Sequence, residues 1–269
     1  MLLLVASILV LFLLNLFLGS VHIPMDSIWN ILWGLDGDES VIWQNIIWKS
    51  RIPQSLTALV AGAGLAVSGL QMQTVFRNPL AGPSVLGISS GASLGVAFVV
   101  LLSGSIGGIA LSRLGFMGEI ALTVAAIVGA LSVMALIVYV SQKVHGNVTL
   151  LIIGVMIGYV ANAVIGVLKF FSVEEDIRAY VIWGLGSFAR VSGNQVTVFI
   201  CIMAVLLPLS FLLIKTLNLL LLGDAYARNL GLNIKRARLQ VIACSGVLVA
   251  IVTAYCGPIT FLGLAVPHL

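Results

Sequence analysis

Long, almost uncharged runs of apolar residues limit this chain to one kind of fold. Seven such runs cover residues 2–18, 56–75, 86–102, 120–140, 150–170, 196–214 and 239–256, and an eighth begins at Ile259. A helix needs roughly 17 to 25 apolar residues to cross a bilayer, whereas barrel strands are shorter and alternate. Charged residues make up only 8% of the chain, against about 25% in soluble domains. The sequence therefore predicts an all-α membrane protein, a polytopic bundle of seven full transmembrane helices and the start of an eighth.

The loops between these runs predict an orientation. No basic residue precedes Lys49 and no small-residue cleavage pattern follows the first run, so we expect that run to stay as a helix. With the N-terminus in the cytoplasm, the inner loops carry seven Lys and Arg residues and the outer loops six. Four of the inner seven lie between Arg228 and Arg238. Because cytoplasmic loops are enriched in Lys and Arg, the segment 222–238 is predicted to be cytoplasmic.

Small residues recur at every fourth position along three of the runs. They are Ala58, Gly62 and Ala66; Gly87, Gly91 and Gly95; and Gly154, Gly158, Asn162 and Gly166. Residues four apart share a helix face, and small ones let helix backbones approach closely in lipid. We expect Gly87, Gly91 and Gly95 to form a helix-packing face. Uncharged polar residues at depth, such as Gln71 and Asn162, either hydrogen-bond between helices or line a path for a polar solute.

The segment 222–238, LGDAYARNLGLNIKRAR, has the marks of a short helix. Asp224 suits the N-cap position, the next six residues are compatible with a helix, and Gly231 suits the position after its end. A basic run, KRAR, follows. By pattern alone, a solvated turn with membrane-flanking charge and a functional element remain equally open.

Two similar segments contain Gly-Pro and follow long apolar runs. They read AGPSVLG at 81–87 and CGPITFLG at 256–263, and are expected on opposite sides of the membrane. Paired interruptions in two halves of a chain are typical of transporters built from inverted repeats. The two segments therefore favour a transporter.

Most enzyme chemistry is excluded. Residues 87–91, GISSG, fit G-x-S-x-G, the nucleophile motif of serine hydrolases. That motif needs a strand-turn-helix context with Asp and His partners, whereas the flanks here are expected membrane helices. No phosphate-binding loop, no HExxH zinc motif and no basic-aromatic pattern for nucleic acid is present. The three cysteines form no CxxC or Cys/His cluster, so no metal site is expected. We predict a protein that is not an enzyme and binds no nucleic acid.

An ion-coupled carrier would need ionisable groups near the bilayer centre. The runs have Glu119 and Lys169 only at their edges. Energy for transport must then come from another subunit, or the protein is passive. An ion-coupled or passive, channel-like transporter of a polar solute remains the alternative, and a membrane scaffold is a third possibility.

Four stretches of the chain form a recognisable set: R-x-P at 51–53, SGLQMQTVFRNPLAGPSVLGISSGA at 68–92, LGDAYARNLG at 222–231 and CGPITFLGLAVPH at 256–268. Together they resemble the membrane subunits of ATP-binding-cassette (ABC) importers for iron-siderophores, haem and cobalamin, the FecCD-type permeases. The resemblance implies a single transmembrane permease domain over residues 1–269, in a bacterial inner membrane. The family fold has ten helices, so we expect this sequence to be truncated at its C-terminus, inside the eighth.

The resemblance also implies partners. A cytoplasmic ATPase subunit uses the ATP, no cofactor binds the permease directly, and the coupling segment is 222–238. The coupling residues are then Gly223, Asp224, Ala227, Leu230 and Gly231. A second permease subunit, expected to be identical, completes the solute path within the membrane lipid.

The remaining site residues follow from the same resemblance. On the extracytoplasmic face, a substrate-binding protein is expected to dock on the R-x-P-R motif, of which Arg51 is present while Gln54 replaces the last arginine. Asn147 and Thr149 match the position of a cytoplasmic gate.

Overall fold

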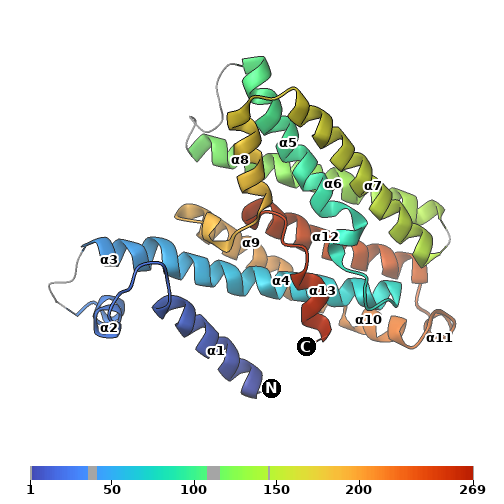
Figure 1. Ribbon diagram of the computed structural model, residues 1–269. Helices are drawn as coiled ribbons and strands as arrows, with labels where there is room; N and C mark the ends of the chain where they lie inside the picture. The colour runs from blue at the N-terminus through green and yellow to red at the C-terminus, as the bar shows by residue number, and fades with distance from the viewer. Residues whose placement is uncertain (1, 36–40, 108–115, 145, 269) are drawn as a thin grey trace. The chain divides into compact units, whose positions relative to one another are not determined.

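The computed structural model describes residues 2–35, 41–107, 116–144 and 146–268, and every regular element in these ranges is helical (Figure 1). The helices are α1 Leu2–Phe17, α2 Met25–Trp33, α3 Val41–Ile46, α4 Ile52–Phe76, α5 Ile88–Gly107, α6 Phe116–Lys143, α7 Asn147–Phe170, α8 Glu174–Gly184, α9 Asn194–Phe211, α10 Ile214–Leu221, α11 Asp224–Asn229, α12 Ile234–Cys256 and α13 Leu262–Ala265. A π-helical turn at Ile47–Arg51 joins α3 to α4, and 3-10 turns form at Pro83–Leu86, Phe188–Arg190 and Val266–His268.

The apolar runs of the sequence lie in helices. Among the described residues, five helical stretches are long and apolar enough to cross a membrane: Val41–Phe76, Met117–Lys143, Val148–Phe170, Asn194–Phe211 and Ile234–Cys256. The other two runs lie in the shorter apolar helices Leu2–Phe17 and Ile88–Leu102. The predicted class, an all-α membrane protein of several helices, is therefore confirmed. In lipid, a single apolar run satisfies its backbone hydrogen bonds by forming a helix.

The chain divides into two compact units. Unit 1 comprises Met1–Ala61 and Phe188–Ile202, and unit 2 comprises Gly62–Ser187 and Met203–Leu269. The core of unit 1 is a cluster of buried isoleucines, Ile23, Ile28, Ile31 and Ile47. Partly buried Phe17, Leu32, Trp43, Ile46 and Ile52 pack around them. The single permease domain expected over 1–269 stays a prediction.

Helix α5 is the centre of unit 2, where it contacts α6, α7, α8 and α12 (Figure 1). Glycines allow these contacts to be close. A Cβ added at Gly91 would lie 2.6 Å from the carbonyl oxygen of Gly129 in α6, and one at Gly95 would overlap the carbonyl oxygen of Ala125. Backbones can approach this closely only where the residue is glycine, which has no Cβ.

Gly87 has a different environment from Gly91 and Gly95. It precedes α5, has a φ of 74°, and ends the 3-10 turn at Pro83–Leu86. A Cβ there would lie 2.9 Å from the carbonyl oxygen of Gly154 in α7. The expectation that all three glycines share one helix face is therefore corrected: Gly87 faces α7 and the other two face α6.

The expected small-residue faces of α4 and α7 are also only partly correct. In α4 the close approaches occur at Gly64 and Gly69, while the nearest atom to a Cβ on Gly62 would be 3.9 Å away, an ordinary contact. In α7 a Cβ on Gly154 would lie 2.7 Å from the backbone of residues 85–86, but one on Gly166 would meet nothing within 4 Å. Spacing alone does not reveal which face meets a neighbour.

The last described segment, which includes α13, lies against α4 and the corner after it. The Gln73 amide donates to the carbonyl oxygen of Leu264 over 3.1 Å, and the ring Nε2 of His268 lies 2.9 Å from the carbonyl oxygen of Pro79. A Cβ on Gly263 would lie 3.0 Å from Pro83. The two Gly-Pro segments thus meet where Pro83 contacts Gly263, at the end of the second segment. Their location on opposite sides of the membrane stays a prediction.

Candidate functional site

The segment 222–238 forms a short helix between two glycine joints. Helix α11 has Gly223 at its N-cap with a φ of 108°, and Gly231 follows its end with a φ of 85°. The sequence predicted Asp224 as the N-cap, which is wrong because Asp224 is already the first helical residue and its carboxylate bonds elsewhere. Asn233 provides the cap of the next helix, since its side chain accepts from the Arg236 backbone N–H at 3.1 Å.

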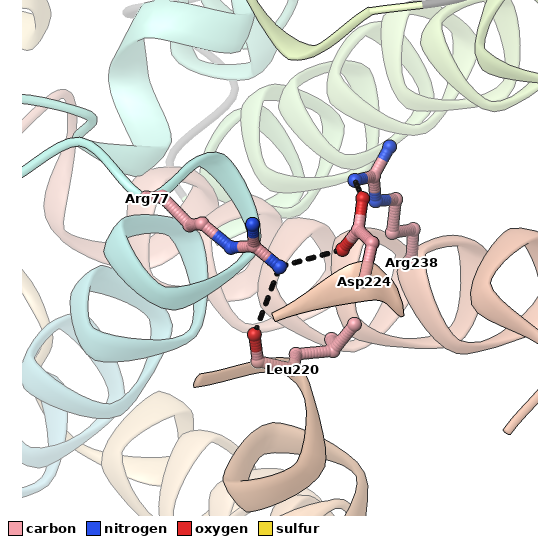
Figure 2. Close-up of polar contacts among 4 residues, drawn as sticks. All are labelled: Arg77, Leu220, Asp224 and Arg238. Carbon is pink, nitrogen blue, oxygen red and sulfur yellow. Dashed lines mark hydrogen bonds and ion pairs between the residues drawn. The ribbon is translucent and has the colours of Figure 1, made fainter. Parts of the chain in front are cut away.

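The Asp224 carboxylate lies between two arginines from distant parts of the chain (Figure 2). Its Oδ1 is 2.7 Å from Nη2 of Arg77, and its Oδ2 is 2.5 Å from Nη2 of Arg238. The same Arg77 nitrogen donates to the carbonyl oxygen of Leu220 over 3.1 Å. The side chains are 43% (Arg77), 37% (Asp224) and 27% (Arg238) exposed. Ion pairs this accessible to water add only about 0–1 kcal/mol each to the free energy of unfolding, so their main effect is to position the side chains relative to one another.

The two faces of α11 differ in burial. Ala227 is fully buried, whereas Tyr226 and Leu230 are 57% and 56% exposed. Leu222 is also exposed. Tyr226 in α11 and Leu230 at its C-cap are four apart and follow one side of the helix, while Leu222 lies just before it, on the other side of Gly223. We call Leu222, Tyr226 and Leu230 the apolar row. Tyr226 was not among the predicted residues, although this spacing could have revealed it.

A cavity of about 190 Å³ lies beside the Asp224 cluster. It is bordered by the end of α4, the end of α6, the start of α7, and α11 and α12; its lining includes Phe76, Val144, Leu150, Asp224, Arg228 and Arg238. Gly146 and Leu150, which flank the predicted gate residues, also line it. Thr149 is exposed, and the side chain of Asn147 lies outside the described residues. The gate role of both residues stays a prediction.

The two predicted path residues lie in different surroundings. Gln71 is buried, and its amide nitrogen is 3.7 Å from Sγ of Cys244 in α12. Its Oε1 has no hydrogen-bond partner among the described residues. Asn162 is exposed on α7. A role in lining the path stays a prediction for both. Within the described ranges, no group of three His, Cys, Asp or Glu side chains could hold a metal.

Arg51, the predicted docking residue, is only 5% exposed. Its Nη1 donates to the carbonyl oxygens of Leu16 at 2.6 Å and Phe17 at 3.1 Å, and its Nη2 donates to that of Val21. A cation suits the end of α1, because the last carbonyls of a helix lack partners and carry partial negative charge. Docking through Arg51 stays a prediction, and this buried role is one that the R-x-P motif did not reveal.

Replacing Arg51 with alanine is expected to destabilise unit 1 by about 3 kcal/mol, because three carbonyl oxygens lose a charged donor. Limited proteolysis of the detergent-solubilised protein should then cut faster near residues 16–21. Lys49→Ala is the matched control, since Lys49 is a neighbouring but exposed cation. Equal protection of the two variants would contradict this role for Arg51.

The fold and the site together define a class of protein. The described part of the chain is a bundle of apolar helices, five of them long enough to cross a membrane, which defines a multi-pass membrane protein. Comparison with known proteins gives the family. The model of the FecCD transport family matches residues 7–269, so the chain belongs to the FecCD transport family.

Individual relatives agree with this assignment. The hemin transport system permease protein HmuU of Yersinia pestis is 36% identical over 265 residues, covering 97% of this chain and 76% of the relative. The vitamin B12 import system permease protein BtuC of Pectobacterium atrosepticum is 34% identical over 245 residues, or 90% and 68% of the two chains. A solved inward-facing structure of a metal-chelate type ABC transporter has a TM-score of 0.78 and 29% identity, covering 97% of this chain and 77% of that one.

The protein is thus the transmembrane permease subunit of an ABC importer in the bacterial inner membrane. It is not catalytic, because in this family ATP is hydrolysed by a separate subunit. An ATPase and a substrate-binding protein are the partners that the family implies. The alternative of an ion-coupled or passive transporter is not retained.

Proposed function

We propose that this permease carries a metal chelate of the iron-siderophore, haem or cobalamin class into the cytoplasm. We further propose that the ATPase subunit drives it by docking on the coupling segment 222–238. The observation that carries the docking proposal is the apolar row of Leu222, Tyr226 and Leu230, exposed on a segment in which Ala227 is fully buried. Exposed apolar side chains on a polar loop are typical of surfaces that bind another protein.

The composition of the segment supports this docking mode. Tyr226 and Leu230 supply apolar contact area, and aromatic residues are enriched in the buried centres of interfaces. The same segment carries exposed positive charge at Arg228, Lys235 and Arg236. Such charge speeds the approach of an acidic partner surface. Two sequence relatives are named as a hemin permease and a vitamin B12 permease, and these names support the proposed substrate class.

The finer composition of the transporter belongs to the same proposal. We expect two identical copies of this permease to share the solute path, with the binding protein on the face opposite the ATPase. No cofactor is expected on the permease itself. Gln71 and Asn162 are proposed for the path, and Asn147 and Thr149 for the inner gate.

The docking proposal is tested by co-purification from membranes that contain the complete transporter. Tyr226→Glu combined with Leu230→Glu is expected to reduce recovery of the ATPase subunit at least about tenfold, because two apolar contacts become buried charges. Thermal stability should hardly change, since both side chains are exposed. Lys215→Glu is the control: it makes the same change of two in net charge on α10, outside the segment.

Normal recovery of the ATPase subunit with the double variant would contradict docking on the apolar row. The substrate class is tested separately, by uptake of haemin, cyanocobalamin and ferrichrome into a strain that lacks its own importers. We expect uptake of at least one of the three, and uptake of none would contradict the proposed substrate class.

A further inference from the structure

Helix α11 is joined to its neighbours through a glycine at each end. Gly223 and Gly231 both have positive φ, and a Cβ on either would meet nothing within 4 Å. The backbone there is hydrogen-bonded within the adjacent turns, from Gly223 N–H to the Leu220 oxygen at 3.2 Å and from Gly231 N–H to the Arg228 oxygen at 2.9 Å. These local bonds do not connect α11 to α4 or α12. For α11 to pass force from a docked ATPase to those helices, side-chain contacts must make that connection.

Asp224 supplies contacts of the required kind. Its two carboxylate oxygens bind arginines that belong to different elements: Arg77 follows α4, and Arg238 lies in the second turn of α12 (Figure 2). Arg77 also binds the carbonyl oxygen of Leu220 in the last turn of α10. Four elements thus meet at one carboxylate and one guanidinium. Bridging contacts from two directions restrict rotation of α11 in a way that one pair could not.

The backbone conformation of Arg77 is independent evidence that an arginine side chain is needed at this position. Helix α4 ends with Asn78 N–H bonded to the Gln73 oxygen at 3.3 Å and Arg77 N–H bonded to the Thr74 oxygen at 3.4 Å. This is the Schellman pattern, which puts Arg77 in the left-handed position that glycine normally fills. Its φ is 48°, and among the described residues no other non-glycine has a positive φ. An arginine there accepts backbone crowding that glycine would avoid.

We propose that Arg77 and Arg238 are positioning residues of the transport reaction, which clamp the coupling helix to α4 and α12 through Asp224. With the clamp closed, displacement of the apolar row moves the ends of α4 and α12. With the clamp open, the same displacement is absorbed at Gly223 and Gly231. The clamp rests on the proposed docking of the ATPase subunit. It assigns Asp224 an intramolecular role, distinct from contact with that subunit.

The charges around Asp224 set the order of the expected effects. Besides the two arginines, Arg228 and Lys235 line the adjoining cavity. Removal of the carboxylate that Arg77 and Arg238 share would leave two unneutralised cations close together, beside a cavity that two further cations line. Asp224→Asn should impair coupling more than the loss of either arginine alone.

The test uses the full chain assembled with its ATPase subunit and binding protein in proteoliposomes. It compares uptake per ATP hydrolysed, with haemin, cyanocobalamin and ferrichrome as probes. Arg77→Gly is the sharpest variant, because glycine suits the Schellman position while the side chain is lost. Arg77→Gly and Arg238→Gln are each expected to keep wild-type recovery of the ATPase subunit but to lower uptake per ATP at least roughly fivefold. Lys215→Gln, which removes an exposed cation outside the segment, should behave as wild type.

A double substitution separates the clamp from general damage. If Arg77 acts through Asp224, adding Arg77→Gly to Asp224→Asn should lower uptake per ATP no further. Additive losses would overturn the clamp, and so would wild-type coupling in both arginine variants. Loss of ATPase recovery in Arg77→Gly would also overturn it, because Arg77 would then contact the partner. A wild-type permease that recovers no ATPase or transports none of the probes would remove the proposed function and the clamp with it.

Discussion

Replacing Gly69 with alanine is expected to lower the stability of unit 2 by about 3 kcal/mol, the upper end of the usual cost of overpacking. A Cβ at this position would overlap the carbonyl oxygen of Gly263, and the carbonyl carbon would lie 2.7 Å away. Both atoms are backbone, so no side chain can rotate out of the way. The segment that contains α13 must move away from α4. The melting temperature of the detergent-solubilised protein should fall by roughly 6–12 °C.

The matched control is Gly62→Ala, which adds the same methyl group to the same helix. The nearest atom to the new Cβ would be 3.9 Å away, in the flexible side chain of Leu262. We expect a neutral or slightly stabilised protein, since alanine favours helix over glycine by about 1 kcal/mol. If both variants melted at the same temperature, the close approach of α4 to Gly263 would be refuted.

Reversing the charge of Asp224 is expected to give the largest functional loss. Asp224→Arg would bring a third guanidinium between Arg77 and Arg238, whose nitrogens now lie 2.7 and 2.5 Å from the carboxylate. Repulsion should push α11 from its place. Uptake per ATP in proteoliposomes should fall at least about tenfold, more than in Asp224→Asn. Folding should change little, because exposed charge pairs contribute about 0–1 kcal/mol each.

Salt provides the check on this prediction. The three side chains are partly accessible to water, so raising ionic strength from about 0.05 to 0.5 M should screen the repulsion and restore part of the uptake in Asp224→Arg. Asp224→Asn, which introduces no new charge, should respond less. An equal response of the two variants would show that charge repulsion is not the cause.

Much of the secondary structure could be predicted because its causes are local. An apolar run must form a helix in lipid whatever its neighbours are. Each of the seven runs therefore lies mostly in a helix of the structure, although the run 196–214 crosses the break between α9 and α10. Gly231 was correctly expected after the end of a short helix, since its left-handed φ is a property of the backbone at that point. The likeness to FecCD-type permeases rested on four motifs read directly from the chain.

What the sequence did not reveal at individual residues has a common origin. Asp224 suits an N-cap by its side chain, but its oxygens bind Arg77 and Arg238, and Gly223 takes the cap instead. Docking through Arg51 stays a prediction, but the contacts of its guanidinium with the end of α1 were not foreseen. In each case a partner far away in the chain competes for the same polar atoms. Local propensity contains no information about that partner.

The sequence by itself determined the class, the helices, the short helix of the coupling segment and the family. Only the tertiary structure decided which glycines are irreplaceable, as Gly69 is and Gly62 is not. It also decided that Arg77, Asp224 and Arg238 form one cluster. The physical reason is that helix formation depends on residues a few positions apart, whereas close packing and shared charges depend on segments that meet only after the helices have assembled.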